Sequence, residues 1–470
     1  MTKFTLPEVA QAVAALTFLV AAAVAIRRRI RGLRVLYVPN AVTAGLIGLL
    51  VGPQVLGKLF DSGTRLSEGL FGTTTVSVWV KLPGLLINVV FAAILLGKHI
   101  PSVRDIWRRS STQALFGATL SFGQYALGLL LAVTILVPVF GMSPLSGALL
   151  EISFSGGHGT AAGLTNTMTD HGFAEGSALA LGLATVGLLG GILIGTVLVN
   201  RAVRSDKIHV AREDGVDTHE VSHELDRMDT APVPEGMDPD PATSPLTVAV
   251  GAILLAILIG WVIQQALIGT EALITGKDAH ATFMSEIPLF PFTIIGGALL
   301  QLAITARGWS HLVPRALINQ IAGLALDLLI TAAIATLSLS AIGNNLGPFL
   351  LLLVVGFAWS IAAILFLAPR FYGSRWFERA IGDFGQSCGT VASGFLLIDM
   401  ADPAATSGAK ESYGYKQLLY EPFFGGGLVT ALAIPIIAGM GATAACIAAS
   451  VLTLACIALG VLLGRRARAT

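Results

Sequence analysis

Long apolar stretches alternate with short polar ones along almost the entire chain of 470 residues. The pattern predicts eleven such stretches, at residues 9–26, 35–57, 79–97, 112–140, 176–200, 246–269, 287–305, 316–342, 345–369, 419–440 and 442–463. An apolar run of about 18 or more residues is typical of a transmembrane helix. The sequence therefore predicts an all-α, polytopic membrane protein with about eleven transmembrane helices.

The composition agrees with this pattern. Hydrophobic residues make up 54% of the chain and charged residues only 12%, whereas about 25% of the residues of a soluble domain are charged. The 53 glycines suit membrane helices, because small side chains let such helices approach closely. The three cysteines lie in apolar or glycine-rich surroundings, and their odd number argues against a disulfide framework.

The positive charges predict the orientation in the membrane. The first apolar stretch is followed by a cluster of arginines, which is the reverse of a cleavable signal peptide. With the N-terminus outside, the alternating segments on the cytoplasmic side carry 24 of the 29 Lys and Arg residues; the others are Lys3, Lys58, Arg65, Lys81 and Lys277. Because positively charged loops stay cytoplasmic, the C-terminus is predicted to lie inside the cell.

Two segments are predicted to enter the membrane without crossing it. Residues 143–172 and 373–408 are too rich in Gly, Ser and Thr for ordinary spans and too apolar for solvated loops. Non-helical backbone at membrane depth is tolerated only where protein or a water-filled cavity surrounds it. We therefore expect two re-entrant hairpins that enter from opposite faces.

Short echoes relate the two halves of the chain. "GTAA" at 159–162 resembles "GTVA" at 389–392, and "DHGF" at 170–173 resembles "SYGY" at 412–415. Each half contains five spans, so the second half is predicted to be inserted upside down, as in many secondary transporters. Chance echoes in a chain rich in Gly and Ala are the alternative explanation.

The expected organisation has four parts. They are an N-terminal membrane repeat at 1–200, an acidic cytoplasmic linker at 201–244, an inverted membrane repeat at 245–440, and an extra C-terminal transmembrane helix with a basic tail at 441–470. The linker carries "HEVSH" at 219–223, which matches a zinc motif only formally, because the segment is acidic and flanked by prolines.

The hairpin tips are the predicted binding site. The candidate residues are Ser155, Gly156, Gly157, His158, Gly159 and Thr160 in the first tip, and Ser387, Cys388, Gly389, Thr390 and Ser393 in the second. A helix starting after Thr160 would direct its positive end at the first tip, which suits a carboxylate. Packing glycines without a binding role remain the alternative.

Oxygen-bearing side chains near the tips are candidates for a sodium site. They are Thr160, Asn166, Asp327 and Asp399, and Asp327 could instead satisfy a neighbouring helix. No intramembrane Lys or Arg is evident as a partner for an anionic substrate; Arg375 and Arg379 are the nearest basic residues. We expect no cofactor other than sodium as the coupling ion.

The motif "SGGHGTAAG" at 155–163, followed by "HGF" and by "ATVGLLGG" at 184–191, resembles the bacterial sodium/glutamate symporters. "VPNAVTAGLIG" in the second span and "GQYALG" in the fourth agree with the order of elements in that family. The resemblance implies sodium-coupled import of glutamate across the bacterial inner membrane, two re-entrant loops at the translocation site, and a homodimer in which a core domain moves against a scaffold. The second tip reads "GQSCGTVAS" at 385–393 and departs from the family pattern, so another dicarboxylate or amino acid remains open.

Two other functions compete with a sodium symporter. One is a proton-coupled or uncoupled transporter of another organic anion. The other is an intramembrane hydrolase using Ser155 and His158, but the sequence has no G-x-S-x-G elbow around Ser155 and no evident acid to orient the imidazole. We therefore predict a transporter and not an enzyme.

Overall fold

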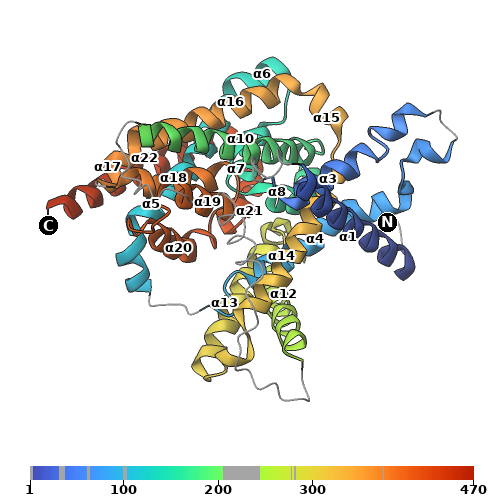
Figure 1. The fold of residues 1–470 in the computed structure, drawn as a ribbon, viewed down its shortest axis with the longest axis horizontal. Coiled ribbons are helices and arrows are strands. Elements are labelled where there is room, and N and C mark those ends of the chain that lie inside the picture. The colour runs from blue at the N-terminus through green and yellow to red at the C-terminus, as the bar shows by residue number, and fades with distance from the viewer. Residues whose placement is uncertain are drawn as a thin grey trace.

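The computed structural model describes residues 4–30, 38–60, 64–98, 103–204, 244–276, 278–279, 282–373 and 375–469. Eight helices within these ranges are long and apolar enough to cross a membrane, and shorter apolar helices accompany them. The protein is all-helical and polytopic, as predicted (Figure 1). Nearly all of the predicted linker, including "HEVSH", lies outside the described residues.

Each predicted span corresponds to a helix or a short run of helices. In chain order they are α1 (Leu6–Arg29), α3 (Asn40–Leu50), α4 (Gly72–Ala93), α5 (Val103–Leu131), α10 (Gly176–Arg204), α12 (Pro245–Thr275), α13 (Phe290–Ala306), α14 (Arg315–Ala335), α16 (Leu346–Ala362), α21 (Leu428–Met440) and α22 (Ala442–Ala469). Helices α3 and α21 are shorter than expected. Helix α3 begins directly after Pro39, and α21 begins only after a run of three glycines at 425–427.

The helices form two groups (Figure 1). In one group, α1, α3 and α4 pack with α12, α13 and α14 through two apolar clusters. In the other, α5, α10, α16 and α22 surround the two predicted hairpin segments within the largest apolar cluster. Each group combines helices from both halves of the chain.

Both predicted hairpin segments are broken helices. The first contains a 3₁₀ turn and α7 (Leu149–Phe154), then α8 (Gly157–Gly163) and α9 (Thr165–Asp170). The second contains α18 (Trp376–Cys388) and α19 (Val391–Ala401), whose arms approach closely at Gly385 and Gly394. Helix α8 starts at Gly157, so the expectation of a helix beginning after Thr160 is wrong by one turn of helix.

The helix before each hairpin carries the same irregularity. Helix α5 continues into the π-helical turn η3 (Ala132–Leu136) and then α6 (Val137–Phe140). Helix α16 continues into η8 (Ala363–Leu367) and then α17 (Ala368–Tyr372). A proline stands second in both α6 and α17, and a glycine with positive φ ends each of them. The two π-helical turns begin 231 residues apart, at 132 and at 363.

The segment after the second hairpin forms a further helix. Helix α20 (Ala409–Tyr420) begins where no span is predicted, and it packs along α5. One face of α20 is buried and consists of Tyr413, Lys416, Gln417 and Tyr420, at the i, i+3, i+4, i+7 spacing of a helix. Polar and aromatic residues form this face, so an apolar-run criterion does not detect it.

Candidate functional site

The two hairpin tips meet inside the second helix group. We define the first tip as residues 155–160 and the second tip as residues 387–393. A Cβ added at Gly157 would lie 3.4 Å from the carbonyl oxygen of Gly389, so the two tips lie next to each other. The structure thus brings together the two sets of residues predicted to bind substrate.

A stripe of glycines on α10 receives the second tip. Gly187 and Gly191 lie one helical turn apart, and a Cβ at either would fall within 3.0 Å of Cys388 atoms. Both glycines belong to the "ATVGLLGG" motif, and the i, i+4 spacing places them on one face of the helix. The motif therefore provides close packing for the tip, as small residues do between membrane helices.

Gln124 of α5 links the two tips. Its Nε2 donates to the carbonyl oxygen of Ser387 at 2.7 Å, and its Oε1 accepts from Ser155 Oγ at 2.7 Å. Ser155 Oγ also lies 3.3 Å from Ser121 Oγ, which contacts the hydroxyl of Tyr420 at 2.5 Å. All five side chains are buried. One glutamine amide thus holds both tips to the same helix.

A glycine turn at 425–427 forms a third irregular segment against the first tip. A Cβ at Gly426 would lie 2.3 Å from Thr160 Oγ1, and one at Gly425 would lie 3.3 Å from the carbonyl oxygen of Ser155. Both glycines have positive φ. The predicted span at 419–440 contains this turn without a break, although "FGGG" at 424–427 signals one.

Glu151, on the entering arm of the first hairpin, is fully buried. Tyr125 donates to its Oε2 at 2.5 Å, and Thr430 of α21 donates to its Oε1 at 3.0 Å. These hydrogen bonds join the first hairpin to α5 and to the helix that follows the glycine turn. Buried carboxyl groups need such partners.

The remaining residues predicted at the tips make local contacts. His158 Nε2 lies 2.9 Å from Thr185 Oγ1 on α10. Thr160 Oγ1 donates to the carbonyl oxygen of Gly156, and the hydroxyls of Thr390 and Ser393 lie 3.1 Å apart. Ser155 and His158 therefore contact different partners and do not form a hydrogen-bonded nucleophile–base pair in the described structure.

The predicted sodium ligands are spread over several elements. Thr160 lies in the first tip, Asn166 is exposed on α9, and Asp327 is half-buried on α14. Asp399 pairs with Lys410 at 2.9 Å. No group of three or more His, Cys, Asp or Glu side chains suited to a metal occurs in the part of the chain that the structure describes.

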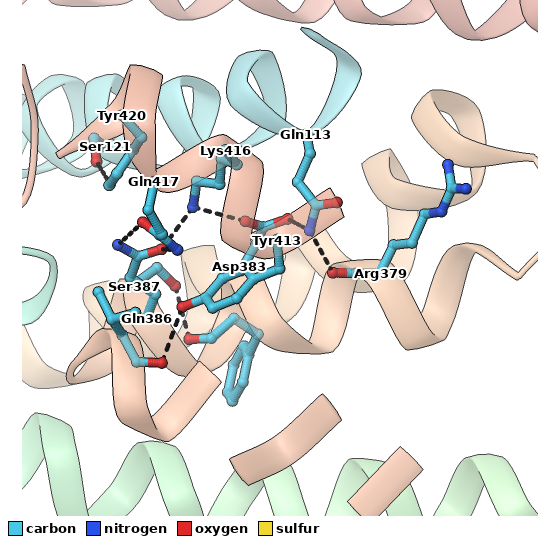
Figure 2. Close-up of polar contacts among 12 residues, drawn as sticks. Gln113, Ser121, Arg379, Asp383, Gln386, Ser387, Tyr413, Lys416, Gln417 and Tyr420 are labelled. Carbon is cyan, nitrogen blue, oxygen red and sulfur yellow. Dashed lines mark hydrogen bonds and ion pairs between the residues drawn. The ribbon is translucent and has the colours of Figure 1, made fainter. Parts of the chain in front are cut away.

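A buried ion pair beside the second tip was missed by the sequence analysis. Lys416 Nζ donates to Asp383 Oδ1 at 2.8 Å and to Gln386 Oε1 at 2.6 Å (Figure 2). No buried Lys or Arg near the tips is evident from the sequence, but Lys416 is buried there, whereas Arg375 is exposed. The polar face of α20 was the available signal, because Lys416 and Gln417 fall between two tyrosines at helical spacing.

Two groups of apolar helices, one of which encloses a pair of broken helices whose tips meet, are typical of the class of secondary transporters of the membrane. The family model of the sodium/glutamate symporter matches residues 6–380. The chain belongs to this family and is a multi-pass membrane transporter for sodium-coupled glutamate symport. No curated protein matches the chain. The matched residues end before the second tip and before α20.

Proposed function

We propose that the two tips, Gln124 and the glycine turn form one substrate site that is exposed alternately to the two sides of the membrane. The observation that carries this proposal is the Gln124 amide, which contacts both tips at 2.7 Å. Backbone N–H groups and hydroxyls can bind a carboxylate substrate, and oxygen atoms can bind sodium. Glutamate is the substrate that family membership favours.

The paired irregularities support an inverted repeat. Matching π-helical turns precede the two hairpins and begin 231 residues apart, which agrees with the 230 residues between Gly159 and Gly389 in the sequence echo. Two inverted halves would bring one hairpin from each face to a shared site. The bacterial inner membrane and a homodimer belong to this proposal on family grounds, and an outside N-terminus belongs to it because of the distribution of positive charges.

A binding role for Ser155 and His158 is favoured over hydrolysis. Ser155 is hydrogen-bonded to Gln124, whereas His158 contacts Thr185. A nucleophilic serine requires a base within hydrogen-bond reach. We therefore propose that the protein is a transporter without enzymatic activity.

Uptake into proteoliposomes tests the transport mode. An inward sodium gradient should drive accumulation of glutamate, and an inward proton gradient without sodium should not. Accumulation driven by protons alone would contradict sodium coupling. Competition by other dicarboxylates defines the substrate range.

Substitution of Gln124 tests the shared site. Gln124→Leu removes both contacts and leaves buried polar groups unpaired, at a cost of about 1–3 kcal/mol for each such group. We expect uptake to fall at least about tenfold. Gln264 is a matched control, because it is also buried and its Nε2 donates to a backbone carbonyl, that of Ile287, at 2.7 Å. Equal uptake by Gln124→Leu and Gln264→Leu would argue against the proposed site.

A further inference from the structure

Lys416 carries a positive charge into the protein interior. Its side chain is 1% exposed, and that of Asp383 is 0% exposed. The ammonium contacts two oxygens of α18, Asp383 Oδ1 at 2.8 Å and Gln386 Oε1 at 2.6 Å (Figure 2). Ser387, the first residue of the second tip, directly follows Gln386. The charge is therefore held one residue from the tip.

The carboxylate of Asp383 is also fixed by other elements. Its Oδ2 accepts from Tyr372 at 2.9 Å and from Gln113 Nε2 of α5 at 3.1 Å. Gln386 Oε1 likewise accepts from Gln417 Nε2 at 3.0 Å. These contacts do not involve the lysine and would remain if it were removed. The buried carboxylate of Asp383 would then lack the positive charge that Lys416 supplies. A carboxylate buried in this way must either be paired with a cation or take up a proton.

The space for the ammonium is provided by a glycine. A Cβ at Gly117 of α5 would lie 2.6 Å from Cε and 2.9 Å from Nζ of Lys416. On another side, Nζ lies 4.0 Å from the centroid of the Tyr420 ring, where a cation is attracted to the π face. Two oxygens and a ring face thus surround one compact positive charge, and the lack of a side chain at Gly117 leaves room for it.

We propose that Lys416 is a tethered cation, whose ammonium fills an oxygen-lined site for a monovalent metal ion beside the second tip. Sodium carries the same charge as the ammonium and prefers the same oxygen atoms. Because the lysine cannot leave, this site takes up and releases no ion during transport. The sodium ions coupled to the substrate bind elsewhere. The proposal concerns ion binding and goes beyond the proposed transport site.

Sodium binding to the purified full-length protein tests this proposal. The probe is radioactive sodium measured by equilibrium dialysis, which does not depend on uptake. Lys416→Ala should bind one more sodium ion per chain than the unmodified protein. The double variant Lys416→Ala, Asp383→Asn should bind the same number of sodium ions as the unmodified protein, because the carboxylate that attracts the extra ion is gone. Lys410→Ala is the matched control, since it breaks the half-exposed pair with Asp399 and should leave the number unchanged.

Thermal unfolding provides the second measurement. Lys416→Ala should be stabilised by sodium chloride relative to choline chloride by a larger shift in Tm than the unmodified protein. The proposal would be overturned if folded Lys416→Ala bound the same number of sodium ions as the unmodified protein and showed no larger shift in Tm. Lys416 and Asp383 would then form an ordinary structural ion pair. Failure to recover Lys416→Ala in sodium chloride would also overturn it, because an ion in the vacated space should replace the ammonium.

Discussion

At the scale of single residues, the two tips contain glycine at Gly157 and Gly389 for different physical reasons. Gly157 has a φ of 70°, in the left-handed region that favours glycine. Gly389 has a φ of −158°, outside the left-handed region, and a Cβ there would lie 2.7 Å from Leu188 Cδ1. One glycine is required by backbone conformation and the other by space.

Gly157→Val should reduce uptake at least about tenfold, because a left-handed residue with a Cβ costs about 1–2 kcal/mol and the added methyls press on the second tip. Gly172→Val is the control: its φ is 74°, yet nothing lies within 4 Å of an added Cβ. Uptake is measured per amount of protein in the membrane. Equal losses in the two variants would show that backbone strain alone, and not tip contact, explains the effect.

At the scale of elements, the C-terminal helix α22 is a packed part of the second helix group. It lies along α5 and against α17. A Cβ at Gly460 would lie 1.9 Å from Cε1 of Phe371, and one at Gly464 would lie 2.2 Å from the carbonyl oxygen of the same residue. Helix α22 therefore supports the two helices that supply Gln113 and Tyr372 to the buried ion pair.

Gly460→Val should lower the stability of the detergent-solubilised protein, because overpacking costs about 1–3 kcal/mol. The measurement is the midpoint of thermal unfolding. Gly251→Val on α12 is the control, since nothing lies within 4 Å of an added Cβ there and the site is exposed. A midpoint unchanged by Gly460→Val would mean that α22 is only loosely attached.

At the scale of the whole molecule, the charge distribution predicts the orientation, which can be measured with single cysteines. Leu6 and Arg465 are exposed near opposite ends of the chain. In a background without the three native cysteines, a membrane-impermeant maleimide should label Leu6→Cys in intact cells. Arg465→Cys should react only after permeabilisation. The reverse result would invert the proposed topology.

The sequence by itself determined the all-helical, polytopic architecture and the two segments in which helices are broken. Apolar runs must lie in lipid or in protein, and backbone at membrane depth must satisfy its own hydrogen bonds, so eleven stretches and two glycine-rich interruptions were sufficient. The motif around Gly157 also carried enough local information to indicate the family.

Only the tertiary structure decided which polar side chains are buried together. Lys416 lies 33 residues from Asp383 in the chain, and its burial depends on the space that Gly117 leaves on a distant helix. Gln124 likewise joins Ser155 and Ser387, which stand on opposite halves of the chain. Periodicity specifies the face of a helix, but not the partner that the face meets. The burial of a polar group is set by that partner, because only a matching donor, acceptor or charge offsets its loss of water.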